Sequence, residues 1–257
     1  MSKFIQLFAI SLLIIGVHNV ASAELLPQQV TDYIQRADDF RLGEESSQVI
    51  SHVAMYEDNV LDKTRQYNVY TRPNRESLVV FKSSVEAGQK MLMLQDNFWL
   101  QMPKSRRPIR ITAMQKLLGE ASVGDISSLT WSEDYQGAWI ASEAVQDEQQ
   151  KSIASHHIQL TAKTSSASYQ TIDLWLDERN GFPIKADLYL RSGKLAKKAF
   201  FTRGERNGDI AVTAMTLFDA IQANKKTVIE YRSITPWQLD DKYYNPSFLA
   251  RNNTTEL

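Results

Sequence analysis

The chain has 257 residues, of which 43% are hydrophobic and 23% are charged, and its formal net charge at pH 7 is −1. This composition is that of a globular protein that can bury a sizeable core, and the balanced charge argues against nucleic-acid binding. Cysteine is absent, which excludes disulfides and cysteine-ligated zinc.

The first 23 residues have the pattern of a cleaved export signal. Lys3 precedes an uncharged apolar run, and Ala21-Ser22-Ala23 has the small residues of a cleavage site. The run is shorter than the roughly 20 residues that a membrane-spanning helix needs. We therefore expect a signal peptide, Met1–Ala23, and one domain over residues 24–257. Because Glu24 takes the place of the cysteine that bacterial lipoproteins require, we expect no lipid anchor.

The mature chain begins with one predicted helix and continues as strands. Pro27 suits the first turn of a helix, Val30 and Ile34 lie on its apolar stripe, and Gly43 ends it. Runs that alternate or are wholly apolar, bounded by turn residues, predict strands. They cover Val49–Tyr56, Arg65–Arg72, Ser77–Phe81, Met91–Leu94, Phe98–Met102, Ile109–Ile111, Trp139–Ala144, His156–Ala162, Ile172–Leu176, Ile184–Leu190, Lys194–Thr202, Ile210–Met215 and Thr227–Ile234.

Two further helices are expected between the sixth and seventh of these strands. Met114, Leu117, Leu118 and Ala121 recur at helical spacing and predict a short helix. Gly124-Asp125 then predicts a stop and an N-cap for another short helix, which carries Ile126 and Leu129.

The sum is an α+β, mainly β fold with one antiparallel meander and three short helices. Short turns between consecutive strands make them antiparallel neighbours. We expect a sheet of about ten strands, and the twist of roughly 20–25° between neighbours must curl such a sheet. From the residues alone, a half-barrel and a closed barrel both remain possible.

Two long stretches resemble a known family. They are W-L-x-x-P-x-x-R-R-P-I-R-I with L-L-G-x-A-S-x-G-D, at Trp99–Ile111 and Leu117–Asp125, and L-W-L-D with F-P-I-K and Y-x-x-S-G-K-L, within Leu174–Leu195. Together they are similar to the periplasmic outer-membrane lipoprotein-sorting proteins, relatives of the lipoprotein carrier LolA. The resemblance implies an open half-barrel whose concave face is covered by the three helices, with a cavity between them.

The resemblance also implies a function. The expected protein is a non-enzymatic periplasmic carrier that holds acyl chains of lipoproteins, or of related lipids, and needs no cofactor. The resemblance further implies that an inner-membrane transporter of RND or ABC type is the donor and that an outer-membrane protein is the acceptor. Two alternatives stay open: a lipid-free adaptor that docks on an RND-type exporter, and a hydrolase of exported lipid, for which no catalytic residue is nominated.

Candidate site residues follow from the apolar surplus of the central segment. A cavity lining is expected from six side chains, with the face of each strand unassigned because strand periodicity gives two faces: Leu92, Leu94, Trp99, Leu100, Met114 and Leu118. Three arginines, Arg106, Arg107 and Arg110, are candidates for a basic rim that holds the lid or meets a partner. The alternative is a solvated turn that protects a sheet edge.

Other chemistry is absent or weak. The sequence has no GxSxG, HExxH, P-loop or GxGxxG motif. His156 and His157 are neighbours on a predicted strand, so they point to opposite faces and cannot share a metal ion. The acidic doublets Asp38-Asp39, Glu133-Asp134 and Asp240-Asp241 are expected to be solvated at element ends, without an acid or base role.

Overall fold

The computed structural model describes residues 24–42, 46–118, 121–126, 130–165, 167–250 and 257, and the expected signal peptide lies outside them. Within these residues, thirteen strands form one antiparallel sheet, and two short strands form a separate hairpin. The predicted fold class, a mainly β open sheet with few helices, is confirmed. The expected number of about ten strands was too low, because all thirteen predicted runs join the same sheet.

Each predicted run overlaps one strand, and several strands, such as β2 and β9, extend well beyond the run that predicted them. The strands of the large sheet are β1 (Ser47–Glu57), β2 (Val60–Arg72), β3 (Glu76–Phe81), β4 (Lys90–Leu94), β5 (Asn97–Gln101), β6 (Ile109–Ile111), β9 (Tyr135–Gln146), β10 (Ser152–Ala162), β11 (Thr171–Asp177), β12 (Pro183–Tyr189), β13 (Leu195–Arg206), β14 (Asp209–Asp219) and β15 (Lys225–Pro236).

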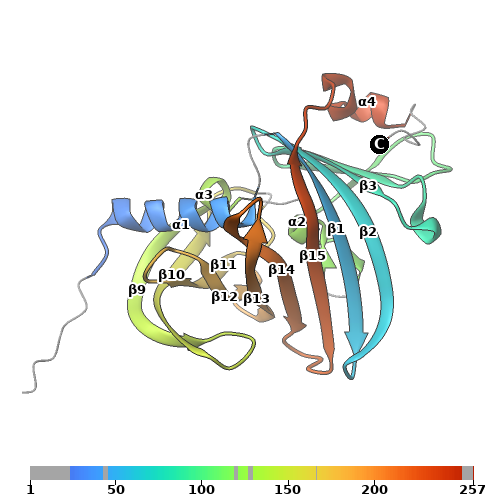
Figure 1. The fold of residues 1–257 in the computed structure, drawn as a ribbon. Coiled ribbons are helices and arrows are strands. Elements are labelled where there is room, and N and C mark those ends of the chain that lie inside the picture. Colours follow the sequence, from blue (N-terminus) through green and yellow to red (C-terminus); the bar gives the residue numbers. More distant parts are fainter. Residues whose placement is uncertain (1–23, 43–45, 119–120, 127–129, 166, 251–256) are drawn as a thin grey trace, which may run out of the picture.

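The sheet is not a single meander from one edge to the other. The chain starts in the middle of the sheet at β1, runs outward to the edge strand β6, crosses to the other edge at β9 and returns to β15. There β15 pairs with β1, so Val49 lies opposite Ile234. The sheet therefore has two arms, and residues 112–134 connect its two free edges (Figure 1).

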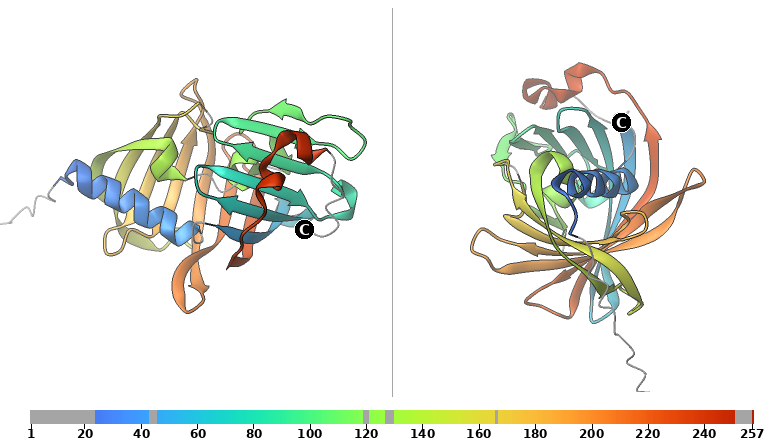
Figure 2. Two further views of the ribbon diagram at one scale, coloured as in Figure 1. Left: turned by 90° about the horizontal axis from the view of Figure 1, so that it is seen from above. Right: turned by 90° about the vertical axis from the view of Figure 1, so that its left-hand side faces the viewer.

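Helix α1 (Pro27–Arg41) covers the concave face of the β9–β14 arm, as the view along the helix shows (Figure 2). Its stripe of Val30, Ile34 and Ala37 is buried in the main core. Gly137 on β9 allows this approach, because a Cβ there would overlap the Cδ1 of Ile34 and lie 3.0 Å from a methyl group of Val30. The predicted first helix, which starts at Pro27 and ends before Gly43, is thus confirmed.

The two helices expected in the connecting segment are not formed as predicted. In this stretch β7 (Lys116–Leu118) pairs with β8 (Ala121–Ser122), and the Val123 N–H donates to the Gln115 carbonyl oxygen beside them (2.9 Å). Eight residues with helical spacing do not outweigh backbone pairing of this kind, since short helices are marginal without tertiary support.

Two one-turn helices follow that hairpin. Gly124 and Asp125 lie inside α2 (Val123–Ile126), where Asp125 is in the first turn and is not the predicted N-cap. The second is α3 (Trp131–Asp134), and Leu129 is outside the described residues.

The C-terminal stretch covers the opposite face of the β1–β5 arm. It contains the 3-10 turn η2 (Asp241–Tyr244) and α4 (Pro246–Leu249), which lies over the strands in Figure 2. Tyr244 and Leu249 pack there in a second cluster with Tyr70, Leu78 and other side chains. A further 3-10 turn, η1 (Ser84–Glu86), connects β3 and β4.

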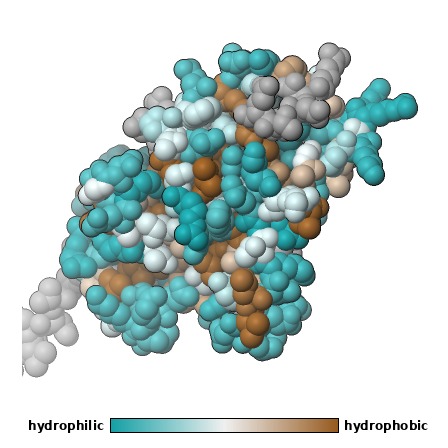
Figure 3. Space-filling view, turned by 45° about the vertical axis from the view of Figure 1, so that its right-hand side comes forward, coloured by the Kyte–Doolittle hydropathy of each residue, from teal (hydrophilic) through white to brown (hydrophobic). Residues whose placement is uncertain are grey.

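The surface is largely hydrophilic in Figure 3, with hydrophobic residues visible in the hollows between hydrophilic ridges. Exposed aliphatic side chains include Val60 and Leu61 on β2 and Ile221 between β14 and β15. In the described part of the chain, no helix is long and apolar enough to cross a membrane.

Candidate functional site

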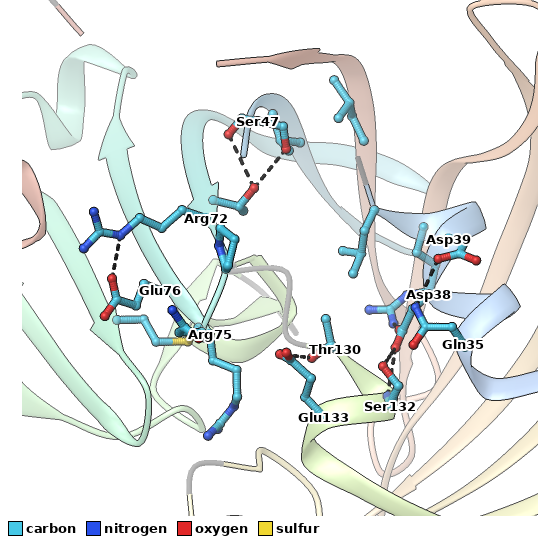
Figure 4. Close-up of a pocket in the computed structure, with 18 of the residues that line it drawn as sticks. Gln35, Asp38, Asp39, Ser47, Arg72, Arg75, Glu76, Thr130, Ser132 and Glu133 are labelled. Carbon is cyan, nitrogen blue, oxygen red and sulfur yellow. Dashed lines mark hydrogen bonds and ion pairs between the residues drawn. The ribbon is translucent and has the colours of Figure 1, made fainter. Parts of the chain in front are cut away.

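A cavity of about 500 Å³ lies where the two arms of the sheet meet (Figure 4). The C-terminal end of α1, the start of β1, the turn between β2 and β3, and the start of α3 surround it. Its lining residues are Gln35, Asp38, Asp39, Arg41, Leu42, Ser47, Val49, Thr71, Arg72, Pro73, Asn74, Arg75, Glu76, Met93, Thr130, Ser132, Glu133, Tyr231 and Ile234.

The inner part of the cavity is apolar. Val49 and Ile234 face each other across the β1–β15 pair, and Met93 reaches the same face from β4. All three are almost fully buried, so they belong both to the cavity wall and to the main core. Methionine has no branch at Cβ and adapts its shape, which suits a wall that must accept a ligand.

A buried carboxylate joins the two helices on one side of the mouth. Asp38 on α1 accepts hydrogen bonds from the backbone N–H groups of Trp131 (3.0 Å) and Ser132 (2.8 Å), at the start of α3. It also accepts from the Ser132 hydroxyl (2.8 Å) and from Arg41 (2.8 Å). Burial raises the pKa of Asp38, while Arg41 and these donors oppose the rise.

Arg75 joins the opposite arm to α3. It lies in the β2–β3 turn, where Asn74 and Arg75 have positive φ angles (66° and 58°). Its guanidinium contacts Asp134 (2.6 Å) and Asp96 (2.8 Å), and the side chain of Asp134 is fully buried. Burial raises the pKa of Asp134, and Thr164 and Arg75 oppose this. Two buried carboxylates, Asp38 and Asp134, thus hold α3 to both sides of the mouth.

The charged side chains fall into two groups around the mouth. In Figure 4, Arg72, Arg75 and Glu76 lie on one side, and Gln35, Asp38, Asp39, Ser132 and Glu133 lie on the other. Arg72 pairs with Glu76 (2.5 Å) and Asp241 (2.5 Å), which links the mouth to η2. Asp39 accepts from Gln35 (3.2 Å), and Glu133 accepts from Thr130 (2.8 Å).

A second buried ionic cluster holds α2 against the concave sheet. The Lys197 ammonium on β13 lies 2.9 Å from Asp125, and both side chains are nearly inaccessible (3% and 7% exposed). Asp125 also accepts from Ser122 (N–H 2.9 Å, hydroxyl 2.7 Å) and from the Tyr169 hydroxyl (3.2 Å). Burial acts to raise the pKa of Asp125, but Lys197 and Ser122 outweigh it and lower the pKa.

Among the side chains that the structure describes, none of those predicted for the cavity or its rim lines this cavity. Leu92, Leu94 and Trp99 lie in the second cluster, on the other face of the sheet. Leu100 and Met114 pack against the main core, and the side chain of Leu118 is outside the described residues. The alternation of a strand left the inward face of β4 open in the sequence, and Met93 lies on the face that lines this cavity. Lipid contact by these side chains stays a prediction.

The three candidate arginines lie at the β5–β6 turn and on the edge strand β6. Arg106 and Arg107 are exposed, and Arg110 stacks over Trp99 (4.7 Å to the ring centre) and donates to Asn97 (2.5 Å). The arginines at the mouth are Arg41, Arg72 and Arg75 instead.

The acidic doublets were only partly solvated. Asp39 and Glu133 are exposed, but Asp38 and Asp134 are buried, which corrects the expectation. A sequence signal for α3 existed in Thr130–Glu133, because T-x-x-E is a capping-box pattern. The pattern marks the start of the helix, but it does not show that Asp38 of α1 accepts from this helix start or that Arg75 of the β2–β3 turn pairs with Asp134.

His156 and His157 point to opposite faces. His156 meets the Tyr33 ring of α1 edge-on (4.8 Å), whereas His157 stacks on Trp175 (4.5 Å). His157 is therefore covered by an aromatic neighbour, and only 16% of its side chain is exposed. Among the described residues, no group of three or more His, Asp or Glu has the arrangement of a metal site.

Known structures share this architecture. A LolA superfamily protein from Nitrosomonas europaea is 27% identical with a TM-score of 0.76, over 84% of this chain and 97% of that one. A DUF1329 family protein from Desulfovibrio piger has the same fold, with 21% identity and a TM-score of 0.70 over 87% of this chain and 98% of that one. A putative outer membrane lipoprotein-sorting protein domain from Vibrio parahaemolyticus also has this fold, with 18% identity and a TM-score of 0.66 over 88% of this chain and 100% of that one. None of the curated proteins matches the sequence.

A curled, open antiparallel sheet with a helix across its concave face and a cavity at its mouth defines the LolA fold class. A family model whose description reads "uncharacterized protein" matches residues 73–251. The chain belongs to this family and has the LolA-like fold.

Proposed function

We propose that this protein is a periplasmic carrier that holds acyl chains of lipoproteins or related lipids and moves them toward the outer membrane. The observation that carries the proposal is the cavity of about 500 Å³, with Val49, Met93 and Ile234 on its inner wall, in a chain of the LolA-like family. The proposal assigns no catalytic residue and no cofactor.

Shielding apolar chains from water is the physical task. Each methylene removed from water contributes about 0.8 kcal/mol, so an acyl chain crosses an aqueous compartment very slowly unless it is covered. The inner wall around Met93 supplies that cover. Export by the segment Met1–Ala23 brings the carrier to the periplasm in this proposal.

Loading requires the mouth to widen. The groups that hold it are the Asp38 contacts with α3 and the Arg75 contacts with Asp134 and Asp96. Separating them loses charge-assisted hydrogen bonds worth roughly 1.5–3 kcal/mol each, so about two to four buried methylenes are needed to offset each bond that is lost. An inner-membrane transporter of RND or ABC type is the donor in this proposal, and an outer-membrane protein is the acceptor.

Native mass spectrometry tests the proposal. The protein from Glu24 onward is purified from the periplasm without detergent, and its bound lipids are extracted and identified. A stoichiometric lipoprotein or lipid is the expected result. A protein without bound lipid, which also binds none when lipid is offered in excess, would refute the carrier.

One observation favours a second candidate, an adaptor of an RND-type exporter. Most of the concave face of the β9–β14 arm is solid core, with Ile158, Leu160, Leu174, Leu176 and Leu217 fully buried beneath α1 or beside it. Capture of an exporter from solubilised membranes by a variant whose cavity is filled, Ile234→Phe, would favour the adaptor. If the Ile234→Phe variant captures no exporter and also carries no lipid, the result would favour the carrier.

A further inference from the structure

The two edges of the large sheet differ in length and in charge. The edge strand β6 has three residues, one of which is Arg110, and two exposed arginines precede it. A short, charged edge of this kind resists pairing with other chains. The edge strand β9 has twelve residues, of which Glu143 is the only charged one, and no described strand pairs with its outer side (Figure 1). The sheet therefore has one long edge that can accept a further strand.

The hydrogen bonds of the β9–β10 pair determine which backbone groups of β9 point outward. The Asp147 N–H donates to the Lys151 carbonyl oxygen (3.0 Å) and closes the hairpin. Bonded and non-bonded pairs alternate in an antiparallel ladder, and the register is regular over the end of β9. The residues that have no backbone bond to β10 are therefore Gln146, Ala144 and Ser142. Their N–H and C=O groups point to the open edge, and no other partner for them is found among the described residues.

This part of the edge is accessible. Helix α1 packs on β9 at Gly137, toward the start of the strand and away from the outward-pointing groups. Ala144 and Gln146 are exposed. The single charge of the strand is turned away from the edge, because Glu143 accepts from the indole N–H of Trp175 (2.7 Å), two strands further into the sheet. The edge thus lacks the charged side chain with which many sheets prevent the addition of a strand.

The same stretch is complementary to itself. When two copies of β9 pair antiparallel about a twofold axis at Ala144, Ser142 of each copy lies opposite Gln146 of the other. All three outward-pointing residues then meet outward-pointing residues, which gives about six backbone hydrogen bonds. Glu143 lies opposite Val145 in this register, so no like charges are directly opposite each other.

We propose that β9 is a dimerisation edge, at which a second copy of this chain adds antiparallel across Ser142–Gln146. The sheets of the two copies then continue into one another, and the open edge of each copy is closed at this stretch. This inference goes beyond the proposed carrier and does not depend on bound lipid. A few backbone bonds must offset the rigid-body freedom that is lost on association, so we expect a weak dimer with a Kd on the order of 10–100 µM.

Sedimentation velocity measures the association. The protein from Glu24 onward is studied from about 1 µM to about 500 µM, and a reversible shift from monomer to dimer is expected over this range. A protein that stays monomeric throughout would overturn the proposal. Capture of a different periplasmic protein at this edge, lost in Ala144→Pro, would assign the edge to that partner and contradict the second copy.

A proline at the centre of the stretch tests the backbone bonds. Ala144→Pro removes an outward-pointing N–H but no bond to β10, and edge strands tolerate proline at such positions. Association should weaken at least about tenfold with the fold intact, whereas the matched control Ala144→Ser keeps the N–H group and should leave the Kd unchanged. Should the proline variant fail to fold, Ala144→Lys places two ammonium groups opposite each other, and association should weaken about tenfold at low salt and recover at high salt. Unchanged association in a folded proline or lysine variant would contradict the proposal.

A crosslink tests the position of the second copy. The chain has no cysteine, so Ala144→Cys introduces a single thiol. The two Cα atoms at the twofold axis are expected to lie about 5.5 Å apart, within reach of a short bismaleimide. We expect a covalent dimer from this variant and far less from Ala223→Cys, at an exposed position between β14 and β15. Equal crosslinking at the two positions, or none from Ala144→Cys in a protein that sediments as a dimer, would place the interface elsewhere and overturn the inference.

Discussion

The buried pair of Asp125 and Lys197 gives the sharpest test of the folded structure. Replacing Lys197 by Met keeps much of the side-chain volume but leaves Asp125 as a buried carboxylate without its cation, which lies 2.9 Å away in the native protein. Breaking a buried pair in this way costs roughly 3–5 kcal/mol. For a domain of this size, where 1 kcal/mol shifts Tm by about 2–4 °C, we expect Tm to fall by about 6–20 °C.

The double variant separates the charge from the loss of packing. Asp125→Asn removes the carboxylate charge, so Lys197→Met with Asp125→Asn should cost less than the sum of the two single changes by about 0.5–3 kcal/mol. Denaturant unfolding followed by tryptophan fluorescence and circular dichroism measures all four proteins.

The pH dependence gives an independent check with a defined sign. In the native protein the pKa of Asp125 lies below its usual value of 3.8, so ionised Asp125 stabilises the fold above that pH, and the contribution is lost as the pH falls through the lowered pKa. In Lys197→Met, burial is no longer outweighed and the pKa rises. The difference in stability between the two proteins should therefore begin to shrink as the pH falls through the raised pKa of the variant, above 3.8, and should go on shrinking down to the lowered pKa of the native protein. A cost under about 1 kcal/mol, or a cost independent of pH, would refute the reasoning.

Two further changes probe how α1 is held. Asp38→Ala should lower the free energy of unfolding by about 2–4 kcal/mol, because it leaves two backbone N–H groups and Arg41 without their acceptor, and Asp38→Asn should lower it less. Denaturant unfolding measures both variants, and a loss under about 1 kcal/mol for Asp38→Ala would contradict this prediction. Gly137→Ala should lower the free energy of unfolding by about 1–3 kcal/mol, because the added methyl group displaces α1. The control is Gly193→Ala, where a Cβ meets no atom within 4 Å but φ is +76°, so the loss should be only about 1 kcal/mol. Thermal unfolding measures both variants, and an equal effect would count against close packing at Gly137.

The local pattern of apolar and turn residues was sufficient to predict the strands. All thirteen runs named from alternation and turn residues are strands of the sheet, because apolar residues at strand spacing, stopped by residues such as Asn180-Gly181, have few other stable arrangements. The same reasoning failed between Met114 and Ala121. There a short run fits both periods, and the backbone bonds of the β7–β8 hairpin decided the outcome.

The sequence by itself determined the strands, the first helix and the family likeness, because each depends on residues that are close together in the chain. Only the tertiary structure decided which side of β4 faces inward, and it placed Met93, not Leu92, at the cavity. It also paired Asp38 with the start of α3 and Asp125 with Lys197, which are 72 residues apart. Such contacts depend on how a curled sheet brings distant strands together, and that depends on the sum of many twists, which no local pattern contains.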